Sequence, residues 1–427
     1  MNNTNRLIRI IVLLVVFFTG IESYAQDTAA CSPKNLSEVL FKKRVNPTTK
    51  IKKNKNTSLI LLPVLGSSPA TGFFLGVGGV AAFYVGSPAN TRMSSSNLAL
   101  QYTTKNQFIL MLKTSAYTPH NRFFLQSDIR LMIYNQPTFG LGTNAPDTSS
   151  FAYQVNINGN NTNGNVGAQP ISYNYIKLHQ IISKTINPSN TLFFGSGYHL
   201  DHHYSIHDDS LHVAEEKYTS HYLYSEKYGF DTSKYTLSGL SANFVVDTRD
   251  NLINPYKGYY VNINARFNTT WLGSSAKSTI LWVEFKHYFS LSEKKSRHVL
   301  AVWAWANIQL SGHAPYMDLP AIGYDSKGLS GRGYAQGRFR GEQMLYSEVE
   351  WRFPISKCTE VLGAAIFANL TTASSKDNGV YLFDYIKPGI GAGLRIMLDK
   401  KSRTNLAMDY GLGKKSNGFY MTAGEVF

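Results

Sequence analysis

The sequence predicts an all-β fold, a transmembrane antiparallel β-barrel of about 16 strands. Three observations predict it. Only 16% of the 427 residues are charged, against roughly a quarter in soluble globular proteins, while aromatic residues reach 13%. Apolar and polar residues alternate with period two over many short segments, as strands with one apolar face require. The longest connections between these segments all fall at one end of the predicted strands.

The first 25 residues are typical of a secretory signal peptide. Two arginines precede an apolar run over residues 10–18, and Ser23 and Ala25 supply small side chains before a cleavage site at Gln26. The run is too short to cross a bilayer as a helix, and no later stretch reaches the roughly 20 apolar residues that a spanning helix needs. We therefore expect a protein exported to the outer membrane of a Gram-negative bacterium.

Residues 26–57 are expected to form a basic periplasmic tail. Eight lysines and arginines lie in this segment before residue 56, so it holds a good part of the net charge of +15. Such a charge run is usually solvated and mostly irregular, and the segment is too short for a folded domain. With the positive charge placed there, no nucleic-acid partner is expected.

Residues 58–427 are predicted to form the barrel. Over residues 261–268 apolar side chains alternate with Asn262, Asn264 and Arg266, and over residues 348–353 they alternate with Glu348, Glu350 and Arg352. A membrane barrel turns the apolar set toward lipid and the polar set toward the lumen. The sixteen predicted strands are 58–65, 71–84, 93–104, 107–117, 121–133, 172–186, 190–204, 236–246, 258–270, 276–290, 296–311, 343–353, 360–370, 389–398, 404–411 and 418–427.

Loop lengths separate a membrane barrel from a soluble β-sandwich. The four longest predicted connections, 134–171, 205–235, 312–342 and 371–388, follow strands 5, 7, 11 and 13. All four therefore follow odd-numbered strands. An outer-membrane barrel with both termini in the periplasm has long surface loops at one end and short turns at the other. A sandwich has no reason to sort its loops in this way.

The last predicted strand carries a candidate signal for barrel insertion. Phe419 and Met421 share one strand face, and the chain ends in Phe427. A terminal aromatic residue on an alternating last strand is the usual signal read by the barrel-assembly machinery of Gram-negative bacteria. We expect this chain to depend on that machinery for its own insertion, although Glu425 interrupts the apolar series.

A turn motif lies between predicted strands 8 and 9. It contains Asp247, Arg249, Asp250, Pro255 and Gly258. Proline and glycine set the backbone of turns, so the segment is expected to be a periplasmic turn in which the two aspartates and the arginine pair locally.

Two glycine-rich motifs accompany that turn. Residues 328–334 read Gly-Leu-Ser-Gly-Arg-Gly-Tyr, and residues 389–395 read Gly-Ile-Gly-Ala-Gly-Leu-Arg. Together with the turn and the terminal Phe, they resemble the barrel of the BamA/TamA-type outer-membrane assembly and translocation superfamily, the bacterial surface antigen family. The resemblance covers roughly residues 58–427. Arg332, Gly333 and Tyr334 match the Arg-Gly-aromatic motif of that family, on the sixth surface loop with five strands after it.

The resemblance implies a fold for this loop. In the family the sixth loop folds back into the lumen, where its arginine pairs with acids on strands 12 and 13. The strand 12 acid corresponds to Glu350, and Asn369 stands where strand 13 usually has an acid. We hypothesise that an ion pair between Arg332 and Glu350 pins the loop; the alternative is a surface loop with a solvated arginine.

The resemblance also implies a function. Members of the family insert or translocate a protein or lipid-linked client, and those that fold other barrels carry N-terminal POTRA domains. This chain resembles a variant lacking POTRA domains, so its activity would depend on the seam between the first and last strands. Gly411, Gly413, Gly418 and Gly424 lie near that seam and suggest weak pairing. The expected partners are outer-membrane lipid and a protein or lipoprotein client. The alternatives are a passive pore or transport barrel for small solutes, and a soluble β-sandwich adhesin.

No catalytic motif, nucleotide loop or defined metal motif appears, so we expect no enzyme activity and no cofactor. One histidine-rich segment leaves two interpretations open, a zinc or copper site or simply solvated loop residues. It contains His199, His202, His203, His207, His212 and His221, with Asp201, Asp208 and Asp209. Cys31 and Cys358 are both predicted on the periplasmic side, either as a disulfide or as two separate thiols.

Overall fold

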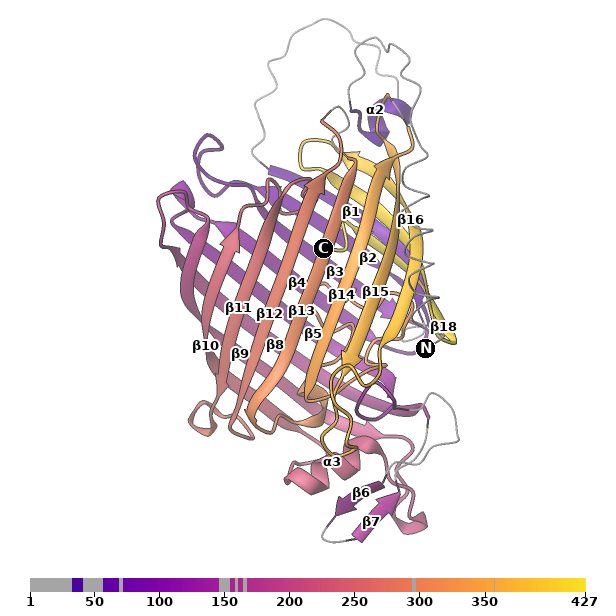
Figure 1. The fold of residues 1–427 in the computed structure, drawn as a ribbon. Coiled ribbons are helices and arrows are strands. Elements are labelled where there is room, and N and C mark those ends of the chain that lie inside the picture. The colour runs from indigo at the N-terminus through magenta and orange to yellow at the C-terminus, as the bar shows by residue number, and fades with distance from the viewer. Residues whose placement is uncertain are drawn as a thin grey trace, which may run out of the picture.

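The chain folds into a sixteen-stranded antiparallel β-sheet that curls into a nearly closed barrel (Figure 1). The computed structural model describes residues 33–40, 57–68, 72–145, 154–157, 160–163, 167–293, 297–356 and 358–427. The predicted signal peptide, residues 1–25, and most of the predicted tail lie outside the described residues. Within the described part, no helix has the length and apolar character to cross a membrane.

Each barrel strand pairs with its neighbours along the chain, so the predicted fold class is confirmed. The strands are β1 Thr57–Ser68, β2 Gly72–Phe83, β3 Ser94–Thr103, β4 Phe108–Tyr117, β5 Phe123–Thr138, β8 Gln169–Thr185, β9 Leu192–Asp208, β10 Tyr235–Asp247, β11 Gly258–Asn268, β12 Ser278–Ser290, β13 Val299–Gly312, β14 Gln343–Pro354, β15 Leu362–Ala373, β16 Lys387–Asp399, β17 Thr404–Gly413 and β18 Ser416–Ala423. Sixteen strands were predicted at these places, with different ends.

The long connections lie at one end of the barrel. The connection after β5 carries a small hairpin, β6 Gln154–Ile157 with β7 Asn160–Asn163, and the connection after β9 carries helix α3, Ser220–Tyr228. Figure 1 places α3 and the hairpin at the end opposite helix α2, Leu36–Leu40. The other two long connections follow β13 and β15. The prediction that long loops follow odd-numbered strands is therefore confirmed.

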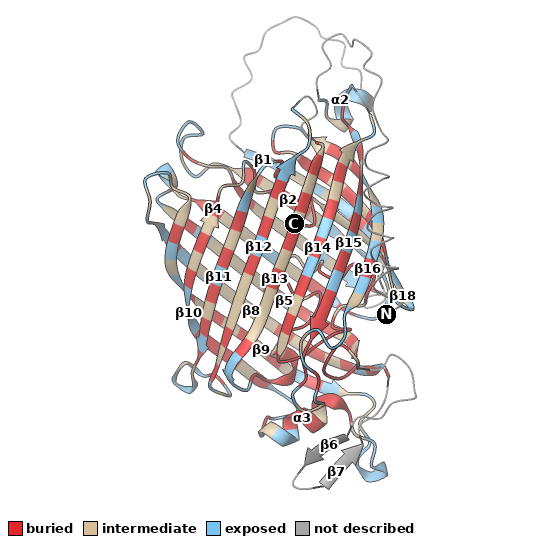
Figure 2. Cartoon of the chain, in the orientation of Figure 1, coloured by how far each residue is buried: buried red, intermediate tan, exposed pale blue. Residues whose placement is uncertain are grey.

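The period-two alternation places apolar side chains outside and polar side chains in the lumen. On β14, Val349 is 45% exposed, whereas Glu348 and Glu350 are buried. On β11, Phe267 is exposed and Arg266 is buried. Figure 2 shows this alternation of burial along the strands. A soluble sandwich would have the opposite pattern, because its apolar face would be the buried one.

The sheet is interrupted at one place, the seam between β1 and β18. These strands lie side by side, with Cα atoms within 8 Å, but no ladder of backbone hydrogen bonds joins them in the described residues. One side-chain bond lies beside the seam, from Ser58 Oγ on β1 to Asp399 Oδ2 on β16, at 2.8 Å. The seam is therefore the weakest line in the wall.

The wall is also lowest beside this seam. Strand β18 has 8 residues, whereas β8 and β9 each have 17. At about 3.4 Å per residue and a tilt near 40°, these lengths correspond to heights of about 21 Å and about 44 Å. The apolar band of an outer-membrane barrel is about 25 Å tall, so only the seam side is shorter than the bilayer it would span.

The C-terminal residues leave the wall and enter the lumen, which corrects the predicted strand 418–427. Strand β18 ends at Ala423, and Gly424 has a φ of 95° that turns the chain inward. The Phe427 ring stacks on Trp303 with ring centroids 5.1 Å apart. The prediction that the strand continues to Phe427 is therefore wrong; Phe419 and Met421 remain on β18, and the insertion signal itself stays a prediction.

The described part of the tail contains a short docked helix, where mostly irregular chain was predicted. Helix α2 lies against the turn after β16, where the Lys400 backbone N–H donates to Asn35 Oδ1 at 2.7 Å and its ammonium pairs with Glu38 at 3.2 Å. The backbone N–H of Asn35 also lowers the pKa of Glu38. Nearby, Cys358 is disulfide-bonded. The chain's only other cysteine, Cys31, lies outside the described residues.

Candidate functional site

The connection after β13, residues 313–342, folds back into the lumen. Its base is closed by a bridge between Ala321 and Arg340, whose guanidinium Nη1 donates to the carbonyls of Tyr316 and Met317 at 2.9 Å each. Farther along, Tyr134 on β5 donates to Gln336 at 2.7 Å. We call this segment the lumen loop. The structure thus places the Arg-Gly-Tyr motif inside the barrel rather than on its surface.

Arg332 lies fully buried at the tip of the lumen loop and contacts three carboxylates. Its Nη2 bonds Glu350 Oε2 at 2.5 Å and also Glu348, and its Nη1 bonds Asp409 Oδ2 at 2.6 Å. The guanidinium carbon stacks 3.4 Å from the centroid of the Phe367 ring. The structure therefore contains the hypothesised pair with Glu350 and adds two further acids. A buried guanidinium needs such partners, because transferring an unpaired charge out of water is costly.

Asn369 contributes through its amide rather than through charge. Its Nδ2 donates to the backbone carbonyl of Arg332 at 3.0 Å. At this position, where the family usually has an acid, the Asn369 side chain thus binds the backbone of the Arg-Gly-Tyr motif. Asp409 on β17 supplies a carboxylate from a different strand. One remaining acid had been expected opposite Arg332, and three are found.

The ion network continues from Arg332 toward the C-terminus. Arg395 bonds Asp409 Oδ1 at 2.6 Å and Glu425 Oε2 at 2.6 Å, and Arg352 bonds Glu350 Oε1 at 2.7 Å. Three arginines and four carboxylates therefore alternate in space, all of them buried. Because each arginine lies between carboxylates, every charged group forms charge-assisted hydrogen bonds in place of the hydrogen bonds to water that it loses on burial. We call these seven residues the ion network: Arg332, Glu348, Glu350, Arg352, Arg395, Asp409 and Glu425.

A track of glycines on β16 and β17 lets the lumen loop lie flat on the inner wall. A Cβ at Gly389 would lie 2.9 Å from the carbonyl oxygen of Arg332, and one at Gly411 would lie 2.6 Å from the nitrogen of Gly333. A Cβ at Gly413 would meet the Tyr334 ring at 2.7 Å. Gly411 and Gly413 are thus explained by close approach of the loop backbone. The interpretation that they mark weak strand pairing stays a prediction.

The turn after β10 forms a second plug, at the opposite end of the barrel from the long loops. Asp247 accepts from Tyr117 at 2.7 Å and from Arg249 Nη2 at 2.7 Å, so this part pairs locally as predicted. Asp250 does not: its Oδ2 accepts from Arg403 Nη1 at 2.6 Å. Arg403 precedes β17, on the far side of a sixteen-strand ring from β10. The turn therefore reaches across the periplasmic mouth.

Burial and charge act together in this plug. Burial by itself lowers the pKa of Arg249, but neighbouring Asp247 outweighs it and raises that pKa above its ordinary value. Asp247 is fully buried. Gly258 closes the turn with a φ of 97°, and a Cβ there would lie 2.3 Å from the carbonyl oxygen of Thr248. Pro255 is buried within the turn. We call residues 247–258 the mouth turn.

Comparison with known proteins identifies the family. A family model described as the Omp85 superfamily domain matches residues 95–427, more than three quarters of the chain. The chain belongs to the Omp85 superfamily. The predicted membership of the BamA/TamA-type superfamily is thereby confirmed. Barrels of this superfamily are outer-membrane proteins of Gram-negative bacteria. No match was found among the curated proteins.

Several solved structures are similar to this Omp85 barrel. BamA from Haemophilus ducreyi lacking POTRA domains 1–3 has 14% sequence identity and a TM-score of 0.49, with 86% of this chain and 69% of that chain covered. CdiB from Acinetobacter baumannii has 15% identity and a TM-score of 0.49, with 86% and 59% covered. CdiB from Escherichia coli has 12% identity and a TM-score of 0.49, with 86% and 61% covered. This chain thus spans less than two thirds of either CdiB chain.

The histidine-rich segment of this Omp85 barrel is divided between the wall and a loop. His199 and His203 face the lumen from β9, buried, and His221 is buried on α3, where its Nδ1 bonds Asp208 Oδ2 at 2.9 Å. The interpretation as solvated loop residues is wrong for these three, because the wall buries His199 and His203 and α3 buries His221. His207 is solvent-exposed. In the described residues, no group of three or more His, Cys, Asp or Glu side chains could hold a metal ion.

The residues that sequence reasoning missed are Glu348, Asp409, Arg395 and Glu425. Glu348 had a visible signal, because it lies two residues before Glu350 and a strand returns to the same face every second residue. Arg395 ends the glycine-rich motif of residues 389–395, and Asp409 lies two residues before Gly411. In the sequence, Glu425 only interrupts the apolar series of the last predicted strand. Its role depends on the inward turn at Gly424, which the alternation does not reveal.

Proposed function

We propose that this chain is an outer-membrane insertion or translocation barrel that moves a protein or lipid-linked client through the seam between β1 and β18. The observation that carries the proposal is the absence, in the described residues, of a hydrogen-bonded ladder at that one position of the ring. An open strand edge can pair with an incoming extended segment. Membership of the Omp85 superfamily supports a client of this kind.

The height of the wall supports the same proposal. Strand β18 is less than half as long as β8, so the bilayer beside the seam would have to thin to match it. A thinner bilayer lowers the cost of passing polar backbone from one side to the other. Thinning and a weak seam would act at the same place, which is where a client would enter.

The passive pore remains the alternative, and the lumen argues against it. The lumen loop and the mouth turn both occupy the space that a solute would cross, and each is tied to opposite walls. A large conducting pore needs an open channel along the axis. No observation in the described residues favours the alternative over the seam.

The test is a disulfide lock beside the seam. Ser58→Cys with Asp399→Cys replaces two side chains that now hydrogen-bond at 2.8 Å, and a disulfide between them would tie β1 to β16. Liposomes containing the variant would receive an unfolded outer-membrane barrel as client, and folding would be followed by heat-modifiable gel mobility. We expect the oxidised lock to lower the folding rate to that of empty liposomes, and reduction to restore it.

Controls separate the lock from other effects. Each single cysteine variant should remain active. Wild-type protein in the same reductant controls for the disulfide that already involves Cys358. An oxidised lock as active as the wild type would refute passage through the seam, and wild-type liposomes no faster than empty ones would refute insertion of this client.

A further inference from the structure

The lumen wall next to the seam is unusually apolar for the inside of an outer-membrane barrel. Inward positions alternate along each strand, and on β1 to β5 many of them hold apolar side chains, where a polar lumen is expected. These side chains line a cavity of about 240 Å³ between the wall, the lumen loop and β18. The apolar lining includes Val64, Phe74, Ile109, Met111, Met132 and Leu329.

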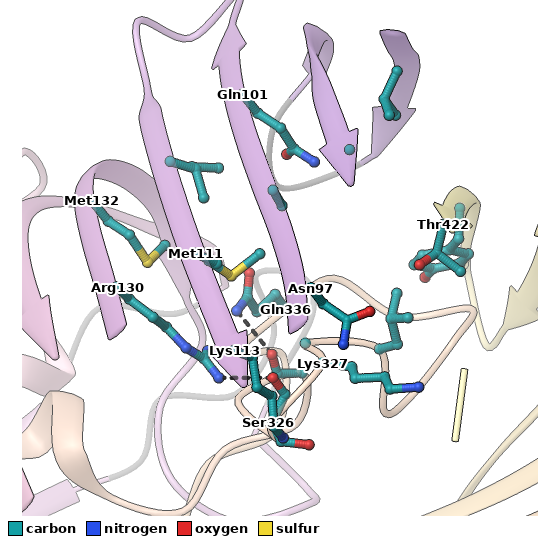
Figure 3. Close-up of a pocket in the computed structure, with 18 of the residues that line it drawn as sticks. Asn97, Gln101, Met111, Lys113, Arg130, Met132, Ser326, Lys327, Gln336 and Thr422 are labelled. Carbon is teal, nitrogen blue, oxygen red and sulfur yellow. Dashed lines mark hydrogen bonds between the residues drawn. The ribbon is translucent and has the colours of Figure 1, made fainter. Parts of the chain in front are cut away.

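Another part of this cavity is cationic. The charged side chains that line it are Lys113, Arg130, Lys327 and a single carboxylate, Asp128. Asp128 is already engaged, because it bonds Arg130 at 2.8 Å and Lys177 at 3.3 Å. Figure 3 shows Lys113 and Lys327 near each other on one side of the cavity, with Asn97 between the wall and the lumen loop.

Lys113 is the decisive residue in this group. It points inward from β4, and among the described residues its ammonium makes no hydrogen bond or ion pair. In the same described residues, the Lys327 ammonium donates only to the backbone carbonyl of Glu425, at 2.7 Å. The nearest further acid, Glu284, pairs with Lys286 at 2.9 Å. Both lysines are half-buried and, in the described residues, neither ammonium forms an ion pair, so an anion that entered the cavity could contact two cations.

The cavity also extends to the seam. Its lining on β18 comes from both faces of that strand, with Tyr420 and Thr422 inward and Phe419 and Met421 outward. Lys113 lies on β4, three strands from the free edge of β1, which at about 4.8 Å per strand is about 14 Å. A volume of about 240 Å³ is far more than a few water molecules occupy.

We propose that this cavity binds an anionic amphiphile, whose head group lies between Lys113 and Lys327 and whose acyl chain lies along the apolar wall toward the seam. The cavity defines the chemical class of the head group. A carboxylate or a phosphate monoester carries the negative charge and the acceptor oxygens that two ammonium groups need. The proposal concerns equilibrium binding and does not depend on transfer of a client. It can therefore fail while the proposed function stands, and the reverse is also true.

The test is a binding titration with the full chain in an uncharged detergent. The probe is dansyl-undecanoic acid, whose fluorescence rises on transfer from water, and its methyl ester is the neutral match; micelles without protein give the background. We expect the acid to bind at least about tenfold more tightly than the ester, which corresponds to one charge-assisted contact. Decanoate and decyl phosphate should both displace the probe, and the competitor that does so at the lower concentration identifies the preferred head group.

Variants locate the site. Lys113→Gln should weaken binding of the acid about tenfold, and Lys327→Gln should do the same. Lys113→Arg should keep it, because the charge remains. Lys277→Gln removes an exposed lysine of a surface loop and should leave the dissociation constant unchanged. Heat-modifiable mobility of every variant shows whether the barrel is folded, and Lys327→Gln, on a loop, is the second variant if Lys113→Gln does not fold.

Three outcomes would overturn the proposal. Equal binding of the acid and its ester would mean that no cationic head site exists. An unchanged dissociation constant in both folded Lys→Gln variants would place the site elsewhere. Displacement of the probe by inorganic phosphate at the same concentration as decyl phosphate would mean that the site takes a free anion and that the apolar wall plays no part.

Discussion

Arg332 is fully buried, and its charge is balanced by Glu348, Glu350 and Asp409. Removing the side chain would leave Glu348 without a cation, while Glu350 and Asp409 would keep only Arg352 and Arg395. Breaking a buried ion pair by removing one partner costs about 3–5 kcal/mol. We therefore expect Arg332→Ala to lower the temperature at which folded barrel converts to the unfolded gel form and to expose the lumen loop to added protease.

Two comparisons make that experiment specific. Arg122→Ala removes an exposed arginine and should leave both readouts at wild-type values. Arg332→Lys keeps the charge but loses the forked contact and the stacking on Phe367, so it should fall between wild type and Arg332→Ala. Unchanged mobility and protease resistance in Arg332→Ala would contradict the pinning of the loop by this residue.

Glu342, just before β14, gives a prediction about pH. Burial raises the pKa of this carboxyl, and Asp377 adds to the effect. A carboxyl whose pKa is higher in the folded state than in the unfolded state destabilises the fold once pH rises above the unfolded value, because the folded state then keeps a proton that the unfolded state has lost. Glu342→Gln should therefore raise the thermal midpoint at pH 8 and have little effect at pH 4.

The check is a pair of melting series in the same detergent, read by gel mobility at each pH. The control is Asp384→Asn. The Asp384 carboxylate lies on a loop and, in the described residues, accepts a hydrogen bond only from the nearby Tyr381 backbone N–H, so this variant should shift neither midpoint. A gain for Glu342→Gln that is equal at both pH values would show that the amide acts through a hydrogen bond and not through the charge.

Single residues of the site were predictable only in part. Glu350 could be expected because a family motif names the partner of Arg332, and Glu348 follows from the parity of the strand. Asp409 and Arg395 lie far from Arg332 in sequence, and their meeting depends on the closure of the barrel. Alternation assigns a side chain to the lumen, but it does not say which residue across the lumen it will meet.

At the scale of elements, the lumen loop packs against the inner surface of β16 and β17. Gly411→Ala would add a methyl group 2.6 Å from the nitrogen of Gly333, against backbone that cannot rotate away. We expect this variant to displace residues 332–334 and to increase cleavage of the lumen loop by protease, while strand content by circular dichroism stays unchanged.

Leu412→Ala is the matched control for that variant. Leu412 is the next residue on β17 and points outward, with 45% of its surface exposed. Its truncation removes lipid contact without touching the loop, so cleavage should match the wild type. Equal cleavage of Gly411→Ala and wild type would contradict the interpretation of the glycine track.

The strands themselves were the most predictable elements, because a lipid-facing side and a lumen-facing side impose period two on the sequence. The short helix α2 was missed, since five residues, little more than one helical turn, are too few to give a periodic signal. The end of β18 was also missed. Phe427 has the strand parity of Phe419 and Met421, and the positive φ of Gly424 turns the chain inward before it.

At the scale of the whole molecule, the lumen is obstructed twice along its axis. The lumen loop crosses its middle between β5 and the wall formed by β15, β16 and β17, and the mouth turn crosses the periplasmic end from β10 to Arg403. Two obstructions along one path act as resistances in series, so the larger one limits the current. Neither plug was foreseen from charge or composition, because both depend on contacts across the ring.

This arrangement predicts how ionic conductance should respond to removal of the plugs. Ile322 and Phe339 are already hydrogen-bonded through their backbones at 3.0 Å, so residues 324–337 can be replaced by Gly-Gly without straining the base of the lumen loop. Asp250→Asn with Arg403→Gln removes the ion pair that holds the mouth turn across the opening. In planar bilayers we expect small, rare openings from wild type and only modest increases from either change alone.

The combined variant should give large, steady openings, greater than the sum of the two separate increases, because both resistances fall together. Replacing residues 213–216 by Gly-Gly, between the bridged His212 and Lys217 of an exposed loop, controls for loop shortening and should conduct like the wild type. Large, steady openings from the lumen-loop deletion alone would show that the mouth turn does not close the barrel. Large openings from the wild-type protein would instead support the passive pore and would contradict the proposal that a client passes through the seam.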